Sequence, residues 1–207
     1  MTIHKLLESA QKRLYAAGYE DAASTVRILS EELLRLSTAR LLAERDREAT
    51  AAEQELVENT LVRLLDHEPL QYILGKAWFM DLELLVNENV LIPRPETELL
   101  AEWILDEHPD GPLRFLDLCT GSGCLLLSIA AHRSHFQGVG TDLSLGALAV
   151  ARENARRLQL TDQVEFRQGD LWEAVPEGES FDFIVCNPPY ITQKDMQELA
   201  ENVKKEP

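Results

Sequence analysis

Two consecutive prolines after an apolar run constrain the fold of this chain most strongly. The tetrapeptide Asn187-Pro188-Pro189-Tyr190 follows the run 181–186, whose apolar side chains predict a buried strand. Proline has no amide hydrogen for a sheet ladder, so the strand must end there. Each proline fixes its own φ and holds the preceding residue extended. The tetrapeptide is therefore predicted to be a stiff bracket at the carboxyl end of a strand.

This bracket carries groups that suit a planar amide or amidine nitrogen. Open α/β sheets bind ligands at the carboxyl ends of their strands. The Asn187 side-chain oxygen and a backbone carbonyl can each accept one hydrogen of an NH2 group, while the Tyr190 ring packs on its face. A proline-rich loop with a structural asparagine cap is the alternative that this segment alone leaves open.

Strand and helix patterns alternate from residue 113 onward. Such alternation predicts right-handed βαβ units and a doubly wound, Rossmann-like parallel sheet, so the fold class is α/β. The expected strands are 113–119, 137–142, 164–170 and 181–186, and the expected helices between them are 124–131 and 145–158.

Residues 1–67 show helical periodicity instead and predict a small bundle of four helices. We expect Thr2 to cap the first helix, Asp21 the second and Ser37 a short third, with a fourth over 49–67. Leu33, Leu34 and Leu36 are assigned to the second helix, and Leu56 to the inward face of the fourth.

The spacing of the apolar residues changes again between the bundle and the sheet. Residues 71–92 predict short strands, as a hairpin, with turn chemistry at 87–89. A further helix is expected to start at a Thr97 cap and run to about 108, with Leu99 and Trp103 facing inward.

Three domains follow from these patterns. Residues 1–68 are expected to form a helical domain, 69–95 a β-hairpin linker, and 96–207 the sheet domain. Four strands are few for a doubly wound sheet, since the mean sheet has roughly 5–6 strands. The chain is therefore expected to be a fragment that lacks its C-terminal part.

Charge argues against nucleic acid as the direct partner. The net charge is −16, and residues 71–207 hold 23 acidic but only 11 basic side chains. Nucleic-acid binders carry basic surface for phosphate contacts, so a cationic cofactor or a basic protein loop matches better. The chain shows no signal peptide and no membrane-length apolar run, which predicts a cytoplasmic protein. Its three cysteines are expected to be buried reduced thiols, and no metal site is expected.

A glycine-containing turn after the first sheet strand predicts a ligand site. In the segment 117–123, Gly121 and Gly123 let the backbone approach a ligand closely. The dinucleotide fingerprint GxGxxG is absent because Cys119 stands where its first glycine would be. A nucleoside ligand without a pyrophosphate fits better, and a purely structural tight turn is the alternative.

Acidic residues end the next two strands. Asp142 ends the second strand, where a carboxylate can hold ribose hydroxyls. Asp170 ends the third, where it can accept from an exocyclic amine while Leu171 covers a ring. Each alone is a common cap or loop residue, but their order with the glycine turn and the Asn-Pro-Pro-Tyr segment is much more specific.

This order resembles the class I methyltransferases that use S-adenosylmethionine. Asn-Pro-Pro-Tyr is similar to the motif of enzymes that methylate exocyclic amines or amides. The linker segments 68–75 (EPLQYILG) and 92–98 (IPRPETE), after a helical domain, resemble the HemK family of protein-(glutamine-N5) methyltransferases, which modify peptide-chain release factors. The resemblance covers nearly the whole chain.

The resemblance implies methyl transfer from S-adenosylmethionine to the glutamine amide in the Gly-Gly-Gln loop of a release factor. It implies that Asn187, Pro188 and Tyr190 are catalytic, and that Pro189 and Arg94 join them in holding the substrate. The residues it implies for the cofactor are Asp117, Thr120, Gly121, Gly123, Asp142, Asp170, Leu171, Trp172 and Asn187.

Two other functions stay open from the sequence. Asn-Pro-Pro-Tyr is shared with DNA and RNA amino-methyltransferases, which act on adenine N6 or guanine N2. A non-catalytic cofactor-binding or interaction module is the third reading. The resemblance further implies a monomer, and an acidic Tyr-Glu-Pro-type segment after residue 207. Without it, this chain is expected to be less stable than a longer one and weakly active or inactive.

Overall fold

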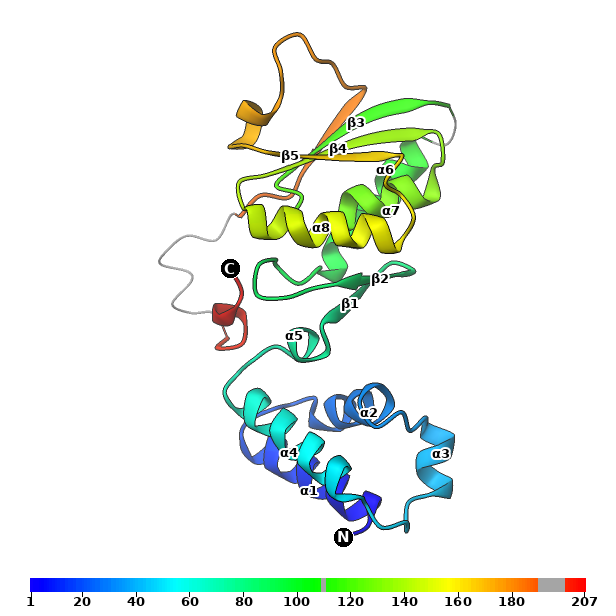
Figure 1. The fold of residues 1–207 in the computed structure, drawn as a ribbon, viewed down its shortest axis with the longest axis vertical. Coiled ribbons are helices and arrows are strands. Elements are labelled where there is room, and N and C mark those ends of the chain that lie inside the picture. Colours follow the sequence, from blue (N-terminus) through cyan, green and yellow to red (C-terminus); the bar gives the residue numbers. More distant parts are fainter. Residues whose placement is uncertain (109–110, 190–199) are drawn as a thin grey trace. The chain divides into compact units, whose positions relative to one another are not determined.

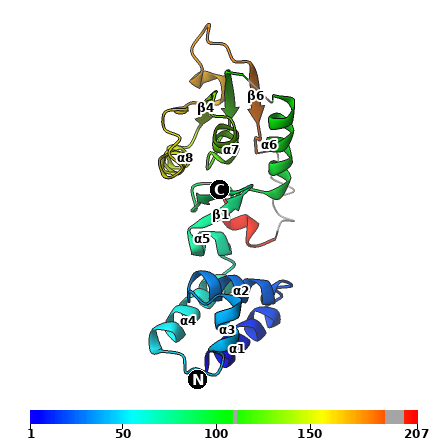
Figure 2. The same cartoon turned by 90° about the vertical axis from the view of Figure 1, so that its right-hand side faces the viewer.

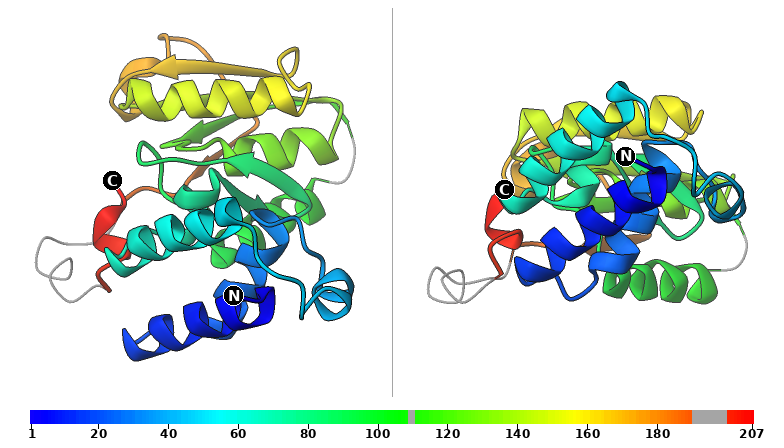
Figure 3. Two further views of the ribbon diagram at one scale, coloured as in Figure 1. Left: turned by 60° about the horizontal axis from the view of Figure 1, so that its bottom comes forward. Right: turned by 90° about the horizontal axis from the view of Figure 1, so that it is seen from below.

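The computed structural model describes residues 1–108, 111–189 and 200–207, and the chain divides into two compact units, 1–74 and 75–207. The N-terminal unit is all helical. Its helices are α1 (Ile3–Ala16), α2 (Ala22–Glu32), α3 (Thr38–Ala43), α4 (Ala51–Leu65) and α5 (Leu70–Leu74). In Figure 3, α1 (dark blue) lies beside α4 (cyan), and the two helices are in contact.

Side-chain caps start three helices of this unit, α1, α3 and α4, as the sequence predicts for the first two of these. Thr2 accepts a hydrogen bond from the Lys5 N–H, and Ser37 accepts one from the Arg40 N–H. Thr50 and Glu53 form a reciprocal capping box at α4. Apolar side chains of α1, α2, α4 and their connections make one core, formed by Ile3, Leu6, Leu7, Ala10, Leu14, Ala22, Val26, Leu29, Leu36, Ala49, Val57, Leu61 and Leu64.

Three details of the helical prediction are wrong. Asp21 occupies the cap position of α2 but makes no side-chain capping bond. α2 ends at Glu32, so the leucines at 33, 34 and 36 lie beyond it, where Arg35 adopts a left-handed φ of 57° that a helix cannot contain. Leu56 on α4 is exposed, because the bundle covers only one face of that helix.

The C-terminal unit begins with the predicted hairpin. Strands β1 (Lys76–Phe79) and β2 (Leu82–Leu85) pair antiparallel, with Phe79 opposite Leu82. The connection between the two strands is Met80-Asp81, and Met80 takes the left-handed φ of 52° that a tight turn needs. The turn predicted at 87–89 follows β2, where the Val90 N–H donates to the Asn87 carbonyl at 3.1 Å. Residues 70–74, expected in part as strand, form α5, whose Leu70 and Ile73 pack on the helical core.

The parallel sheet has the order β5-β4-β3-β6. Its strands are β3 (Leu113–Leu118), β4 (Phe136–Asp142), β5 (Val164–Gln168) and β6 (Phe183–Cys186), all close to their predicted ranges. Helices α6 (Pro95–Glu107), α7 (Cys124–His132) and α8 (Leu145–Arg157) lie in a row on one face of the sheet (Figures 1 and 2). The α/β architecture expected from the alternating pattern is confirmed.

Side chains alternate between the two faces of β3. Phe115 points into the large core under the helices, whereas Leu116 and Leu118 form a smaller cluster with Val139, Val175 and Phe181 on the other face. The inward positions predicted for Leu99 and Trp103 on α6 are wrong. Both side chains are more than half exposed, because the inward face of α6 instead carries Ala101, Ile104 and Leu105. In the described part of the chain, no helix is long and apolar enough to cross a membrane.

Candidate functional site

The four carboxyl ends of the sheet strands meet at one edge. Leu118 at the end of β3 is in register with Thr141 of β4 on one side and with Cys186 of β6 on the other. Asp142 is in register with Gln168, the last residue of β5. The glycine turn, Asp142, the segment around Asp170 and Asn187 therefore follow neighbouring strand ends. The chain order reverses between β3 and β6, and ligands bind at such a switch point.

The turn after β3 has the backbone that close ligand approach requires. Cys119, Gly121 and Gly123 have φ values of 59°, 56° and 81°, all in the left-handed region. The Thr120 N–H donates to the Thr141 carbonyl at 2.9 Å, which fixes the turn against β4. At Gly123 an added Cβ would lie 3.0 Å from a Leu127 side-chain carbon, so this glycine serves the packing of α7.

Asp117 lies beneath this turn rather than facing a ligand. Its carboxylate is almost fully buried and accepts the Thr120 hydroxyl at 2.6 Å. Burial raises the pKa of Asp117 to about 7, against the hydrogen bonds from Thr120 and the Leu126 backbone, which lower it. This position suits a residue that orients the turn, whereas the resemblance implies that Asp117 contacts the cofactor.

Asp142 presents its carboxylate at the edge of the sheet. One oxygen accepts the Gly121 N–H at 2.9 Å and the other accepts the Ser144 N–H at 2.9 Å. A carboxylate oxygen can accept a second hydrogen bond, so both oxygens can still receive ribose hydroxyls. Asp142 therefore joins the glycine turn to the site, over a sequence separation of 21 residues.

Apolar side chains surround the end of β5. Asp170 is exposed at the start of a short 3-10 helix, Leu171–Ala174, in which Leu171 and Trp172 are also exposed. The Gly169 N–H donates to the Asp142 carbonyl at 3.1 Å, which holds this segment beside β4. Leu143 is exposed next to it. These apolar surfaces can cover the faces of a planar ring.

Asn187 is held in one orientation from α6. Its Nδ2 donates to the Thr97 hydroxyl at 3.3 Å, so its side-chain oxygen is left to accept. Pro188 and Pro189 follow it and are exposed. Tyr190 lies outside the described residues. Thr97 was expected to cap α6, but Arg94 holds the cap position and Pro95 the first turn, which leaves Thr97 buried and free to meet Asn187.

Arg94 is engaged by a carboxylate from the C-terminal segment. Its Nη2 lies 2.6 Å from Glu206, whose other oxygen accepts the Ile92 N–H at 3.0 Å. The Glu206 side chain is only 2% exposed, so the pair holds residues 92–94 in place. The role of Arg94 in holding substrate stays a prediction, because Glu206 already occupies part of its guanidinium.

The edge fits the nucleoside cofactor expected from the sequence. An added Cβ at Gly121 would meet nothing within 4 Å, so space is open above the turn. Asp142 offers acceptors for ribose, and the apolar residues after β4 and β5 offer surfaces for a base. S-adenosylmethionine has this chemistry, with a ribose, a base and no pyrophosphate.

Three residues of this edge were missed from the sequence. Leu143 follows an acidic strand end, and an apolar residue exposed at that position is a signal that could have been used. Thr97 was noticed only as a helix cap. Glu206 carried no signal, because a lone glutamate near the end of a charged segment is typical of exposed surface. The cysteines were expected to be buried, but Cys186 is exposed and Cys119 partly so.

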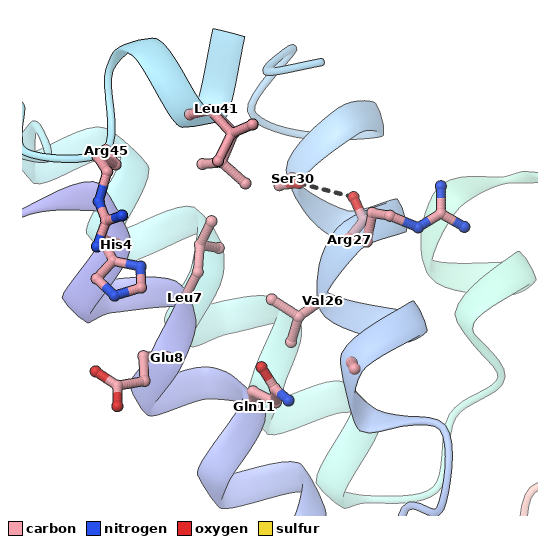
Figure 4. Close-up of a pocket in the computed structure, with 11 residues that line it drawn as sticks. His4, Leu7, Glu8, Gln11, Val26, Arg27, Ser30, Leu41 and Arg45 are labelled. Carbon is pink, nitrogen blue, oxygen red and sulfur yellow. Dashed lines mark hydrogen bonds between the residues drawn. The ribbon is translucent and has the colours of Figure 1, made fainter. Parts of the chain in front are cut away.

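The N-terminal unit has a hollow of its own, drawn in Figure 4. Its volume is about 280 Å³, and it lies between α1, α2 and α3. Leu7, Val26 and Leu41 point into it, while charged side chains such as Glu8 and Arg45 stand at its rim. It has no glycine turn, which sets it apart from the site in the C-terminal unit.

Two protein families match this chain. The family described as the PrmC N-terminal domain matches residues 5–75, and the family described as the methyltransferase small domain matches residues 95–205. The second match contains the whole candidate site except Arg94 and Glu206.

Curated relatives match along nearly the whole chain. A release factor glutamine methyltransferase of Nitratidesulfovibrio vulgaris is 35% identical over 98% of this chain and 69% of the relative. One of Koribacter versatilis is 38% identical over 99% of this chain and 72% of the relative. Among solved structures, a SAM-dependent methyltransferase of Thiobacillus denitrificans in complex with S-adenosyl-L-homocysteine is 29% identical, with a TM-score of 0.38 over 45% of this chain and 36% of that one.

Proposed function

The chain belongs to the release factor glutamine methyltransferase family and is an S-adenosylmethionine-dependent methyltransferase, and from that premise we propose that it methylates the side-chain amide nitrogen of a glutamine in a peptide-chain release factor. The acceptor is the glutamine of the Gly-Gly-Gln loop. The observation that carries the proposal is the placement of Asn187 beside the glycine turn, at the switch point of the sheet.

The cofactor site is formed by the strand ends. Gly121 gives the backbone room, Asp142 receives the ribose hydroxyls, and Asp170, Leu171 and Trp172 surround the base. Asp117 and Thr120 support the turn from below. Gly123 leaves room for Leu127 of α7 and Ala151 of α8. Bound S-adenosylmethionine supplies an electrophilic methyl group on a sulfonium.

The residues of the bracket orient the acceptor amide. The Asn187 side-chain oxygen accepts one hydrogen of the glutamine NH2, and the Pro188 carbonyl accepts the other. A primary amide nitrogen is a poor nucleophile because its lone pair is delocalised into the carbonyl. Two acceptors favour its pyramidal form and stabilise the positive charge that develops on nitrogen. Alignment of this nitrogen with the methyl group and the sulfonium sulfur lowers the entropic part of the barrier to transfer. Pro189 and Tyr190 are proposed to line the pocket for the acceptor amide. The nitrogen loses its proton to water.

The rest of the chain presents the substrate protein. The N-terminal helical domain binds the release factor away from its loop, and the hairpin linker with Arg94 closes over the site. The net charge of −12 in residues 71–207 favours a basic protein loop over nucleic acid. The enzyme is proposed to act as a monomer in the cytoplasm.

Methyl transfer from labelled S-adenosylmethionine tests the proposal. The acceptors are an unmodified release factor, its Gln→Ala variant in the Gly-Gly-Gln loop, and duplex DNA, RNA or single-stranded DNA. The Koribacter versatilis relative is run beside the chain as a working comparison. Label that depends on the glutamine supports the proposal. Label on nucleic acid alone would instead assign the chain to the amino-methyltransferases of DNA or RNA, and cofactor binding with no transfer to any acceptor would leave only a binding module.

A further inference from the structure

Two thiols meet where the glycine turn passes the end of β6. Leu118, the last residue of β3, is in register with Cys186, and Cys119 directly follows it in the chain. The two thiols lie close enough for each to shift the pKa of the other. A disulfide tolerates Cα separations of roughly 4.4–6.8 Å, and neighbouring strands of a sheet lie about 4.8 Å apart. Both cysteines are free, and Cys186 is exposed.

The two cysteines lie next to residues of the proposed site. Cys119 opens the turn that carries Gly121, and Cys186 immediately precedes Asn187. A covalent bond between them would join the cofactor turn to the acceptor bracket across the switch point between β3 and β6. Cys119 also sits at a φ of 59°, where glycine is the favoured residue, so the turn gains nothing in backbone energy from having a cysteine there.

We propose that Cys119 and Cys186 form a dithiol modification site that low-molecular-weight disulfides convert to an intramolecular disulfide, and that this disulfide opposes cofactor binding. The Cys186 thiolate attacks a disulfide RSSR, forming Cys186–S–SR and releasing RS⁻, which takes up a proton as RSH. The Cys119 thiolate then attacks the Cys186 sulfur, forming Cys119–S–S–Cys186 and releasing a second RSH. The two protein thiols are oxidised, and one RSSR is reduced to two RSH.

The surroundings of the pair decide which thiol reacts first and how fast. Burial raises the pKa of Cys119 to about 11, and the nearby Cys186, Asp142 and Asp117 raise it further. Burial also raises the pKa of Cys186, but the neighbouring Cys119 thiol opposes this. The exposed Cys186 is therefore the attacking group. Exchange is slow at neutral pH and gains about tenfold per pH unit while the thiolate is the minor form.

The third cysteine provides a matched control. Cys124 begins α7, and burial raises its pKa to about 12. Trypsin leaves Cys119 and Cys124 together in residues 115–133 and Cys186 in residues 168–194, so a crosslink in the wild type does not by itself say which cysteine is bonded. The Cys124→Ala variant removes this ambiguity.

Oxidised glutathione in excess at pH 8.5, followed by thiol blocking and peptide mass mapping, tests the pair. The expected result is a crosslink between residues 115–133 and 168–194 in the wild type and in Cys124→Ala, and none in Cys119→Ala or Cys186→Ala. Crosslinking that persists in Cys119→Ala, or glutathione on Cys186 without any crosslink in Cys124→Ala, overturns it.

Calorimetric titration with S-adenosylhomocysteine tests the consequence and rests on the cofactor assignment above. The oxidised Cys124→Ala chain should bind at least about tenfold more weakly than the reduced one, within the usual range of coupling between sites. Equal affinities of the oxidised and reduced chains would contradict the proposal that the disulfide weakens cofactor binding. Absence of binding by the reduced chain would count against the cofactor assignment and leave the mass-mapping result intact, so the two failures are distinguishable.

Discussion

The Thr97 hydroxyl receives a hydrogen bond from the Asn187 amide at 3.3 Å, across a sequence separation of 90 residues. An asparagine amide has a donor and an acceptor end, and because Nδ2 is used in this contact, the side-chain oxygen remains as an acceptor. Thr97 on α6 therefore restrains the side chain of Asn187, which directly follows β6. Thr97 is a positioning residue in the proposed reaction.

Replacing Thr97 by valine should lower turnover about tenfold, the effect of losing a hydrogen bond worth about 1.4 kcal/mol in the transition state. Thr97→Ser keeps the hydroxyl and should retain most of the turnover. Single-turnover methyl transfer with saturating cofactor measures the change. If valine and serine variants fell equally, Thr97 would be acting through packing alone.

Replacing Asn187 by alanine should lower turnover by about two to three orders of magnitude, as removal of one preorganised stabilising group does in other enzymes. The affinity for S-adenosylhomocysteine should change little, because the ribose and base are held by other strand ends. Turnover is measured on the release factor, and binding by calorimetry. Near-native turnover of the variant would remove Asn187 from the mechanism.

Replacing Asp142 by alanine should weaken cofactor binding by about 1–3 kcal/mol through the loss of charged acceptors. The variant also removes the acceptor of the Gly121 N–H, so the turn loses a support. Asp162→Ala, at an exposed loop position, is the matched control for loss of one negative charge. Calorimetric titration with S-adenosylhomocysteine distinguishes the two variants. Equal affinities would show that the ribose is held elsewhere.

Asp117 should make the chain less stable as pH rises from about 4 to about 7. Its folded pKa of about 7 is above the ordinary value of 3.8, so the folded state binds a proton that the unfolded state releases within this window. The contribution is complete below pH 4 and is lost as the pH rises through 7. Asp117→Asn stays neutral and lacks this dependence.

Urea unfolding of the wild type and of Asp117→Asn at several pH values measures this effect. The difference between their unfolding free energies should change by up to about 1.4 kcal/mol per pH unit inside the window. Taking the difference removes the opposite trend from ion-paired carboxylates such as Glu179, whose pKa is lowered to about 2 by Arg167 and Arg114. A constant difference would mean that Asp117 is ionised in the fold.

Local patterns in the sequence predicted much of the fold. The order of strands and helices from residue 113 onward is confirmed, because period-2 and period-3.6 apolar patterns depend on the residues themselves. The end of β6 was also predicted, because Pro188 and Pro189 have no amide hydrogen for a sheet ladder. The hairpin and the turn at 87–89 were also expected, but the connection Met80-Asp81 was not singled out, since it lacks the glycine that marks most two-residue turns.

Contacts between distant segments were beyond the reach of those patterns. Leu99 and Trp103 share the apolar character of Ala101 and Ile104, and only the packing of α6 on the sheet decides which side is covered. The buried pairing of Arg94 with Glu206 joins residues 112 positions apart. No local periodicity encodes such a partner.

The sequence by itself determined the elements, their order and the residue types at the strand ends. The tertiary structure decided which strands are neighbours, and therefore that Cys119 meets Cys186, Asp142 holds Gly121, and Thr97 directs Asn187. The physical reason is that strand order and register depend on the combined burial of all the elements, whereas each element's own pattern depends only on its nearest residues.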